Sequence, residues 1–100
     1  MSENYPDKLD KKMIKAFSLL KGEKEIENFL RDLLTIGEIK EASKRFEIAT
    51  MLWQGGLTCE QIAKRAKTST TTVTRVAHWL VKKGLDGYRT VLMRMYPKKR

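Results

Sequence analysis

The sequence has 100 residues, the length of one domain, and its 21 lysines and arginines exceed its 12 acidic residues to give a net charge of +9. Such an excess favours a polyanionic partner, nucleic acid in preference to an anionic membrane surface. No run is apolar enough to span a membrane, the polar first twelve residues argue against a signal peptide, and a lone cysteine cannot form an internal disulfide, all of which favours the cytoplasm.

The first third of the chain predicts a loose arm and two short helices. Residues 1–6 form the arm. An apolar stripe at helical spacing then predicts a helix from about Asp7, which Lys21 and Gly22 end, and a second helix closes at Thr35. The stripes consist of Leu9, Met13, Ala16, Phe17 and Leu20 in the first helix, and of Ile26, Phe29, Leu30, Leu33 and Leu34 in the second.

Thr35 predicts the start of a third helix, because Glu38 follows three residues later in the order of a capping box. Gly55 and Gly56 are expected to terminate this helix. Its second half is apolar on more than one face, which is typical of a helix that is central or shared between subunits.

Residues 58–82 carry the pattern of a helix-turn-helix. Thr58 and Gln61 form a second capping-box pair, and Ile62, Ala63 and Ala66 share one face of the helix that follows. A break of about three residues leads to a second helix whose apolar residues are Val73, Val76, Ala77, Leu80 and Val81. Cys59 lies on the apolar side of the first helix and is expected to be a small packing residue.

The turn and the outward face of the second helix point to DNA. Lys67 occupies the position where such turns often have glycine in a left-handed conformation, so strain or a different turn is expected there. Basic residues before the turn suit phosphates, and short hydroxyls at a helix start suit base edges and phosphates. The predicted DNA-binding residues are Lys64, Arg65, Lys67, Ser69, Thr70, Thr71, Thr72 and Thr74. The alternative is that the threonines only cap the helix.

The end of the chain predicts one more amphipathic helix and a basic tail. Gly84 is expected to stop the preceding helix, and Asp86 and Gly87 to form a turn. The last helix then carries Leu85, Tyr88, Val91, Leu92 and Met95, and residues 97–100 form the tail. With no strand signal, the sequence predicts a single all-α domain of about six helices over residues 1–100, with a central helix-turn-helix.

The terminal helices favour a homodimer. Their apolar stripes have little core to face in a chain this short. A second copy would cover them, and the alternative is that they fold back on their own chain.

These residues together resemble the Trp repressor family (TrpR-like), in particular its YerC/YecD-type members. The resemblance is densest from Arg31 to Lys83, in Asp32-Leu33-Leu34-Thr35, in the helix around Arg45, in Gly55-Gly56 and in Thr72-Val73-Thr74-Arg75. It implies an intertwined helical homodimer in which each subunit supplies one helix-turn-helix to a palindromic operator in double-stranded DNA.

The resemblance also implies an effector pocket between the central helix and the recognition helix. Thr35, Arg45 and Arg75 match the family's pocket positions, whereas Val76 and Trp79 stand where tryptophan-binding members have Gly and Ser. Both changes add bulk to one wall, and Trp79 could itself turn into the space. We therefore expect no tryptophan corepressor. The alternative is that Trp79 points to solvent and that Thr35, Arg45 and Arg75 bind a smaller carboxylate, and the sequence indicates no other cofactor.

The expected function is that of a transcriptional regulator, a repressor acting by occlusion of a promoter. The competing hypothesis is a protein-interaction module in which the helix-turn-helix serves only for packing. Catalysis is not expected, because the one histidine and one cysteine have no orienting carboxylate nearby in sequence, and the chain has no metal-spaced cluster or phosphate loop.

Overall fold

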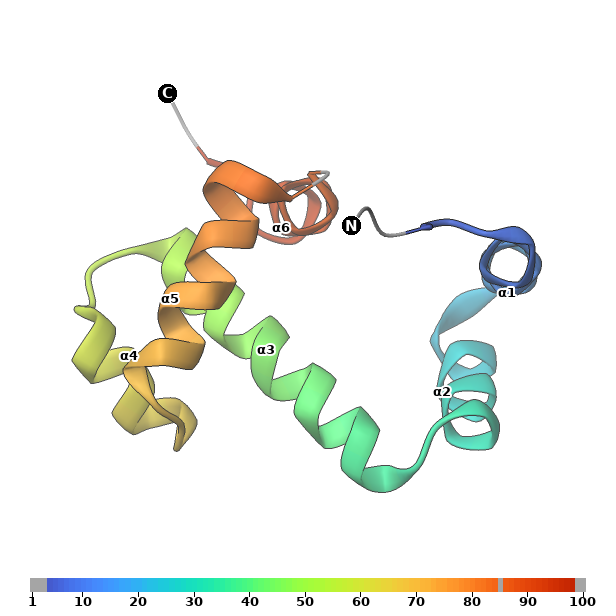
Figure 1. Ribbon diagram of the computed structural model, residues 1–100, viewed down its shortest axis with the longest axis horizontal. Coiled ribbons are helices and arrows are strands. Elements are labelled where there is room, and N and C mark those ends of the chain that lie inside the picture. Colours follow the sequence, from blue (N-terminus) through green and yellow to red (C-terminus); the bar gives the residue numbers. More distant parts are fainter. Residues whose placement is uncertain (1–3, 85, 99–100) are drawn as a thin grey trace. The chain divides into compact units, whose positions relative to one another are not determined.

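The computed structural model describes residues 4–84 and 86–98, which form six α-helices, one π-helical turn and no strand (Figure 1). This confirms the predicted all-α class. The helices are α1 (Lys8–Ser18), α2 (Gly22–Leu33), α3 (Ile36–Gln54), α4 (Cys59–Ala66), α5 (Thr70–His78) and α6 (Gly87–Met95), and the π-helical turn η1 spans Trp79–Lys83. The chain divides into two compact units, Met1–Ile39 and Lys40–Arg100.

The N-terminal unit begins with a reciprocal cap. The Asp7 carboxylate accepts a hydrogen bond from Asp10 N at 2.8 Å, and the Asp10 carboxylate accepts one from Asp7 N at 3.0 Å. Each carboxylate thus accepts from a backbone N–H that has no partner within the helix. The predicted stop at Lys21 and Gly22 is wrong: α1 ends at Ser18, and Gly22, at φ +78°, is the first residue of α2.

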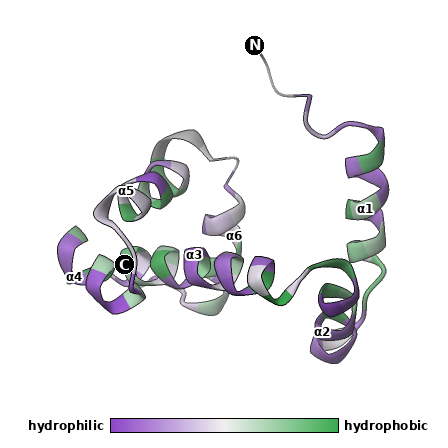
Figure 2. Cartoon of the chain, turned by 60° about the horizontal axis from the view of Figure 1, so that its bottom comes forward, coloured by the Kyte–Doolittle hydropathy of each residue, from purple (hydrophilic) through white to green (hydrophobic). Residues whose placement is uncertain are grey.

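Side-chain packing in this unit is sparse. Phe17 of α1 and Phe29 of α2 meet edge to face, with ring centroids 5.0 Å apart. Neither helix contains a fully buried residue. Figure 2 shows hydrophobic residues alternating with hydrophilic ones along both helices. The predicted apolar stripes are therefore present, but the unit itself covers them only in part.

The long helix α3 begins as predicted. Thr35 Oγ1 accepts from Glu38 N at 3.1 Å, and the Glu38 carboxylate accepts from Thr35 N at 2.9 Å. The helix stops before Gly55 and Gly56, both at positive φ. Its second half buries five residues, Ile48, Ala49, Thr50, Met51 and Trp53. These fall on more than one face, so the prediction of a central helix is confirmed for this half.

The C-terminal unit is built around that half of α3. Its buried apolar residues are Ile48, Ala49, Met51 and Trp53 from α3, Ile62 and Ala63 from α4, Val73 and Val76 from α5, Leu80 from η1 and Leu92 from α6. The indole N–H of Trp53 donates to the Tyr96 carbonyl at 3.0 Å, and Lys98 Nζ lies 4.2 Å from the Trp53 ring centroid. The residues after α6 thus close over the end of α3.

Helices α4 and α5 form the predicted helix-turn-helix. Thr58 and Gln61 cap α4 reciprocally, at 2.8 and 3.1 Å. Lys67 has φ 57° and ψ 52°, which is the strained left-handed solution. The amide of the next residue donates to the Ala63 carbonyl at 2.9 Å and so closes the end of α4. Ser69 caps α5 by accepting from Thr72 N at 3.2 Å.

Two predictions around this motif are wrong. Cys59 is exposed rather than packed against the core, because as the first residue of α4 it precedes the turn that meets α5. Val81 is 68% exposed, because the regular helix ends at His78 and the wider π-helical turn breaks the α-helical phase that placed this residue inward.

Gly84 and α6 complete the unit. A side chain at Gly84 would clash with the Trp79 carbonyl, so the end of η1 requires glycine. In α6 Leu92 is fully buried, whereas Val91 and Met95, both predicted to lie on its apolar side, are about half exposed at 45% and 51%. Leu85 and the tail residues 99–100 lie outside the described residues, as do residues 1–3 of the arm. No described helix has the length and apolarity needed to cross a membrane.

Candidate nucleic-acid interface and cavity

The outward surface of the helix-turn-helix collects nearly all the predicted DNA-binding side chains. Those that are exposed are Lys64, Arg65, Lys67, Ser69, Thr70, Thr71 and Thr74. The buried faces of α4 and α5 hold Ile62, Ala63, Val73 and Val76 instead. The separation leaves a surface of ammonium, guanidinium and hydroxyl groups at the start of α5.

This surface suits a phosphate backbone. Free N–H groups at a helix start attract anions, and the three basic side chains lie on α4 and at the turn that precedes α5. A threonine offers a hydroxyl to a base edge and a methyl to thymine. Thr70, Thr71 and Thr74 lie on one short helix, so a major groove could receive them together.

Thr72 differs from its neighbours because it is half buried. Its hydroxyl lies 3.2 Å from the Ser69 hydroxyl, within the cap of α5. It also lines a cavity on the other side of the helix. Thr72 therefore connects the start of α5 with that cavity.

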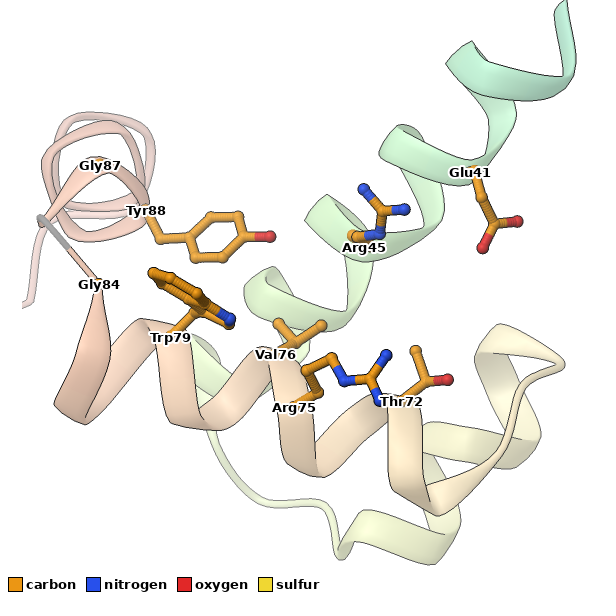
Figure 3. Close-up of a pocket in the computed structure, with 9 residues that line it drawn as sticks. All are labelled: Glu41, Arg45, Thr72, Arg75, Val76, Trp79, Gly84, Gly87 and Tyr88. Carbon is orange, nitrogen blue, oxygen red and sulfur yellow. The ribbon is translucent and has the colours of Figure 1, made fainter. Parts of the chain in front are cut away.

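The cavity has a volume of about 730 Å³ and lies between α3, α5 and the segment from η1 to α6. Its lining residues are Glu41 and Arg45 of α3, Thr72, Arg75 and Val76 of α5, and Trp79, Gly84, Gly87 and Tyr88. In the view of Figure 3, the aromatic rings of Trp79 and Tyr88 lie toward one end and Glu41 toward the other. Two guanidinium groups and one carboxylate leave the lining with a positive balance that favours a small anion.

Comparison with known proteins identifies this arrangement. The family model described as Trp repressor protein matches residues 8–96. This chain belongs to the Trp repressor family. It is a family of helix-turn-helix DNA-binding regulators, not of enzymes.

Solved structures agree with the family over the whole fold. A TrpR-like protein from Eubacterium eligens is 34% identical, with a TM-score of 0.81, and the match covers 95% of this chain and 96% of that one. A Trp repressor candidate from Staphylococcus aureus is 29% identical, with a TM-score of 0.82, and the match covers 99% and 100%. A comparison with curated proteins gives no match.

Four of the five residues expected in the family's effector pocket line the cavity: Arg45, Arg75, Val76 and Trp79. The fifth, Thr35, belongs to the N-terminal unit, where it caps α3, and is not a lining residue. That the Trp79 ring takes the ligand's place stays a prediction. Its side chain is 46% exposed and forms a wall of a space that stays open.

Sequence analysis missed five cavity residues, Glu41, Thr72, Gly84, Gly87 and Tyr88. Glu41 precedes Arg45 by one helical turn, so its position on the same face was readable from the spacing. Tyr88 reaches the cavity through the irregular segment from η1 to the start of α6, and no local sequence pattern predicts the path of that segment. Among the described residues no cluster of three or more histidine, cysteine or acidic side chains could hold a metal ion.

Proposed function

We propose that this chain is a sequence-specific repressor of transcription that binds a palindromic operator in double-stranded DNA as a homodimer. The observation that carries the proposal is the exposed surface of basic and hydroxyl side chains on a packed helix-turn-helix. Bound across a promoter, such a dimer excludes the transcription machinery by occupying the site. We expect it to act in the cytoplasm, where that DNA would be.

The homodimer is supported by the N-terminal unit. None of its helical residues is fully buried, and large apolar side chains remain exposed there, including Leu9 at 77% and Leu19 at 64%. A second copy would remove this surface from water. In the dimer we expect the two α5 helices to lie about 34 Å apart, because they must enter successive major grooves.

The contacts divide into two classes. Lys64, Arg65 and Lys67 neutralise phosphates, so they supply affinity that is independent of sequence and sensitive to salt. Thr70, Thr71 and Thr74 read bases, together with Thr72 where its hydroxyl is not engaged by Ser69. Ser69 keeps α5 capped at the DNA surface.

The test begins with the selection of bound duplexes from a random pool, followed by binding titrations on a selected and a random duplex. Thr74→Ala should weaken binding to the selected duplex by about 1–3 kcal/mol and leave the random duplex nearly unchanged. Lys67→Ala should weaken both about equally and reduce the salt slope by about one unit. Selection of no sequence at all would favour the rival reading of the helix-turn-helix as a packing motif in a protein-interaction module.

The cavity supports a second proposal, that a small carboxylate other than tryptophan occupies it and adjusts the position of α5. Arg45 and Arg75 can bind a carboxylate, and the Glu41 carboxylate can accept a hydrogen bond from an N–H group of the same ligand. Val76 is 4% exposed and packs in the core, so an indole could not lie against the α5 backbone there without displacing it. Added bulk of that kind costs about 1–3 kcal/mol in a packed interior.

Calorimetry separates the ligands. Tryptophan should show no saturable binding, whereas a panel of aliphatic and aromatic carboxylates should contain a ligand whose binding is lost in Arg45→Ala and in Arg75→Ala. Lys44→Ala, next to Arg45 and outside the cavity lining, is the matched control. Saturable tryptophan binding at tens of micromolar, with a tryptophan-dependent gain in operator affinity, would overturn this proposal and leave DNA binding itself untouched.

A further inference from the structure

Helix α1 carries four lysines on one face. Lys8, Lys11, Lys12 and Lys15 follow the spacing i, i+3, i+4, i+7, which places them along a single stripe of an α-helix. All four are exposed. We call this stripe the lysine face. It belongs to the N-terminal unit and shares no residue with the helix-turn-helix.

The lysine face lies opposite the apolar side of the same helix. At about 100° per residue, Leu9, Met13 and Phe17 fall across the helix axis from the lysines. Phe17 packs edge to face against Phe29 of α2. Phe17 on the apolar side therefore packs on α2, and the lysine face is the side that α1 presents away from that contact.

Carboxylates within the helix do not neutralise these charges. Asp10, the acidic residue of α1, accepts from Asp7 N in the cap. The ion pair recorded among the described residues joins Lys24 and Glu27 of α2 at 3.6 Å. Like charges three and four residues apart destabilise a helix, whereas α2 mixes both signs. A polyanion bound along this stripe would therefore reduce the repulsion among its lysines.

We propose that the lysine face is a second nucleic-acid contact, which binds phosphates of duplex DNA independently of sequence. The inference rests on the proposed function, since it assigns the same polyanion to a second surface. Lysine acts as a point charge toward phosphate, and the four side chains extend along about 10 Å of helix. Duplex DNA offers a phosphate charge about every 1.7 Å along its axis, so several can be neutralised at once.

An anionic membrane fits this face less well. Basic amphipathic helices bind lipid by burying their apolar side in the acyl boundary. In α1 Phe29 covers that side at Phe17, and the proposed second copy would cover the exposed Leu9 and Met13. The phosphates of DNA require only the lysines.

The experiment compares the full-length double variant Lys11→Gln/Lys15→Gln with the wild type on a selected and a random duplex, over a range of salt. If both lysines contact phosphates, the slope of log affinity against log salt falls by about two units per chain, and affinity near 0.1 M salt falls on the order of tenfold on both duplexes. Lys11→Arg/Lys15→Arg should retain the wild-type slope. Thermal unfolding of the glutamine variant should occur at the same or a higher temperature, because like-charge pairs are gone.

Lys21→Gln/Lys24→Gln is the matched control, with the same charge change in the same unit outside the lysine face. An equal loss in the control would show a net-charge effect and overturn the proposal, as would an unchanged slope in the test variant. Binding to phosphatidylserine vesicles that depends on Lys11 and Lys15, with unchanged DNA binding, would assign the face to a membrane instead. If wild-type protein selects an operator and the lysine variant binds it normally, only this inference fails and the repressor function stands.

Discussion

The two units of this chain bury their apolar side chains to different extents. The C-terminal unit buries ten apolar residues contributed by α3, α4, α5, η1 and α6. The helices of the N-terminal unit carry comparable apolar stripes and bury none of them fully. One unit holds its fold by contacts within the chain, whereas the other leaves part of its apolar stripes exposed, which is the surface that the proposed second copy would cover.

Charge divides the units in the same way. Residues 1–39 contain seven basic and eight acidic side chains, while residues 40–100 contain fourteen basic and four acidic ones. The net positive charge of the protein therefore belongs to the unit that carries the helix-turn-helix. In the N-terminal unit the basic charge is local, because α1 concentrates four lysines and α2 is acidic. The net charge of the whole chain shows neither this division between the units nor the concentration of lysines on α1.

The largest expected effect comes from the core of the C-terminal unit. Ile62 is 1% exposed, and Ile62→Ala should destabilise the protein by about 2–5 kcal/mol because it leaves a cavity among close-packed side chains. The measurement is chemical denaturation. Lys64→Ala, exposed on the same helix, should stay within about 0.5 kcal/mol of the wild type. Equal effects of the two substitutions would contradict the core assigned to this unit.

The N-terminal unit gives a smaller effect that decides whether a second copy covers it. Leu9 is 77% exposed in the single chain, so a monomer predicts almost no change for Leu9→Ser. Burial against a partner predicts a loss of about 1.5 kcal/mol or more. It also predicts a midpoint of unfolding that rises with protein concentration. A concentration-independent midpoint with no loss in Leu9→Ser would mean that the unit is complete by itself.

Helix boundaries set by local chemistry were predictable from the sequence. Thr35 with Glu38 and Thr58 with Gln61 form the expected reciprocal caps, and Lys67 adopts the left-handed conformation, one of the two outcomes expected for this turn. Each of these features depends on residues within one turn of each other. The fold class and the helix-turn-helix follow from such signals together with the apolar spacing.

Features that depend on irregular backbone were not predictable. The π-helical turn after His78 exposes Val81 and precedes the segment that brings Tyr88 to the cavity. The local sequence indicates this turn only through Gly84, where a side chain would clash with the Trp79 carbonyl. Helical periodicity assumes a constant phase, so it placed Val81 inward. The exposure of the proposed DNA-contacting residues could be predicted because they are what remains outside once the core of α4 and α5 is assigned. The cavity joins three segments that are distant in sequence, so no local pattern defines its lining.

The cap of α5 gives a prediction of about 1 kcal/mol within the well-packed unit. Ser69→Ala removes the acceptor for Thr72 N and should destabilise the protein by about that amount. Ser69→Asp keeps an acceptor and complements the helix dipole, so it should retain stability while its charge repels phosphate and weakens DNA binding. Denaturation and DNA titration of both variants check this. Weakened stability in Ser69→Asp would contradict the role of Ser69 as a cap.

The smallest expected effect separates strain from charge at Lys67. A residue with a side chain pays about 1–2 kcal/mol for this left-handed backbone. Glycine avoids that strain, but it loses more backbone entropy on folding, which offsets part of the benefit. Lys67→Gly should therefore stabilise the protein by about 0.5–1 kcal/mol, whereas Lys67→Ala keeps the strain and should not. Both variants remove the same ammonium group, so both should flatten the salt slope of DNA binding by about one unit. If glycine restored DNA affinity relative to alanine, the lysine would act through the shape of the turn. Equal DNA binding by two variants of different stability would show that this lysine is kept at a strained position for its charge.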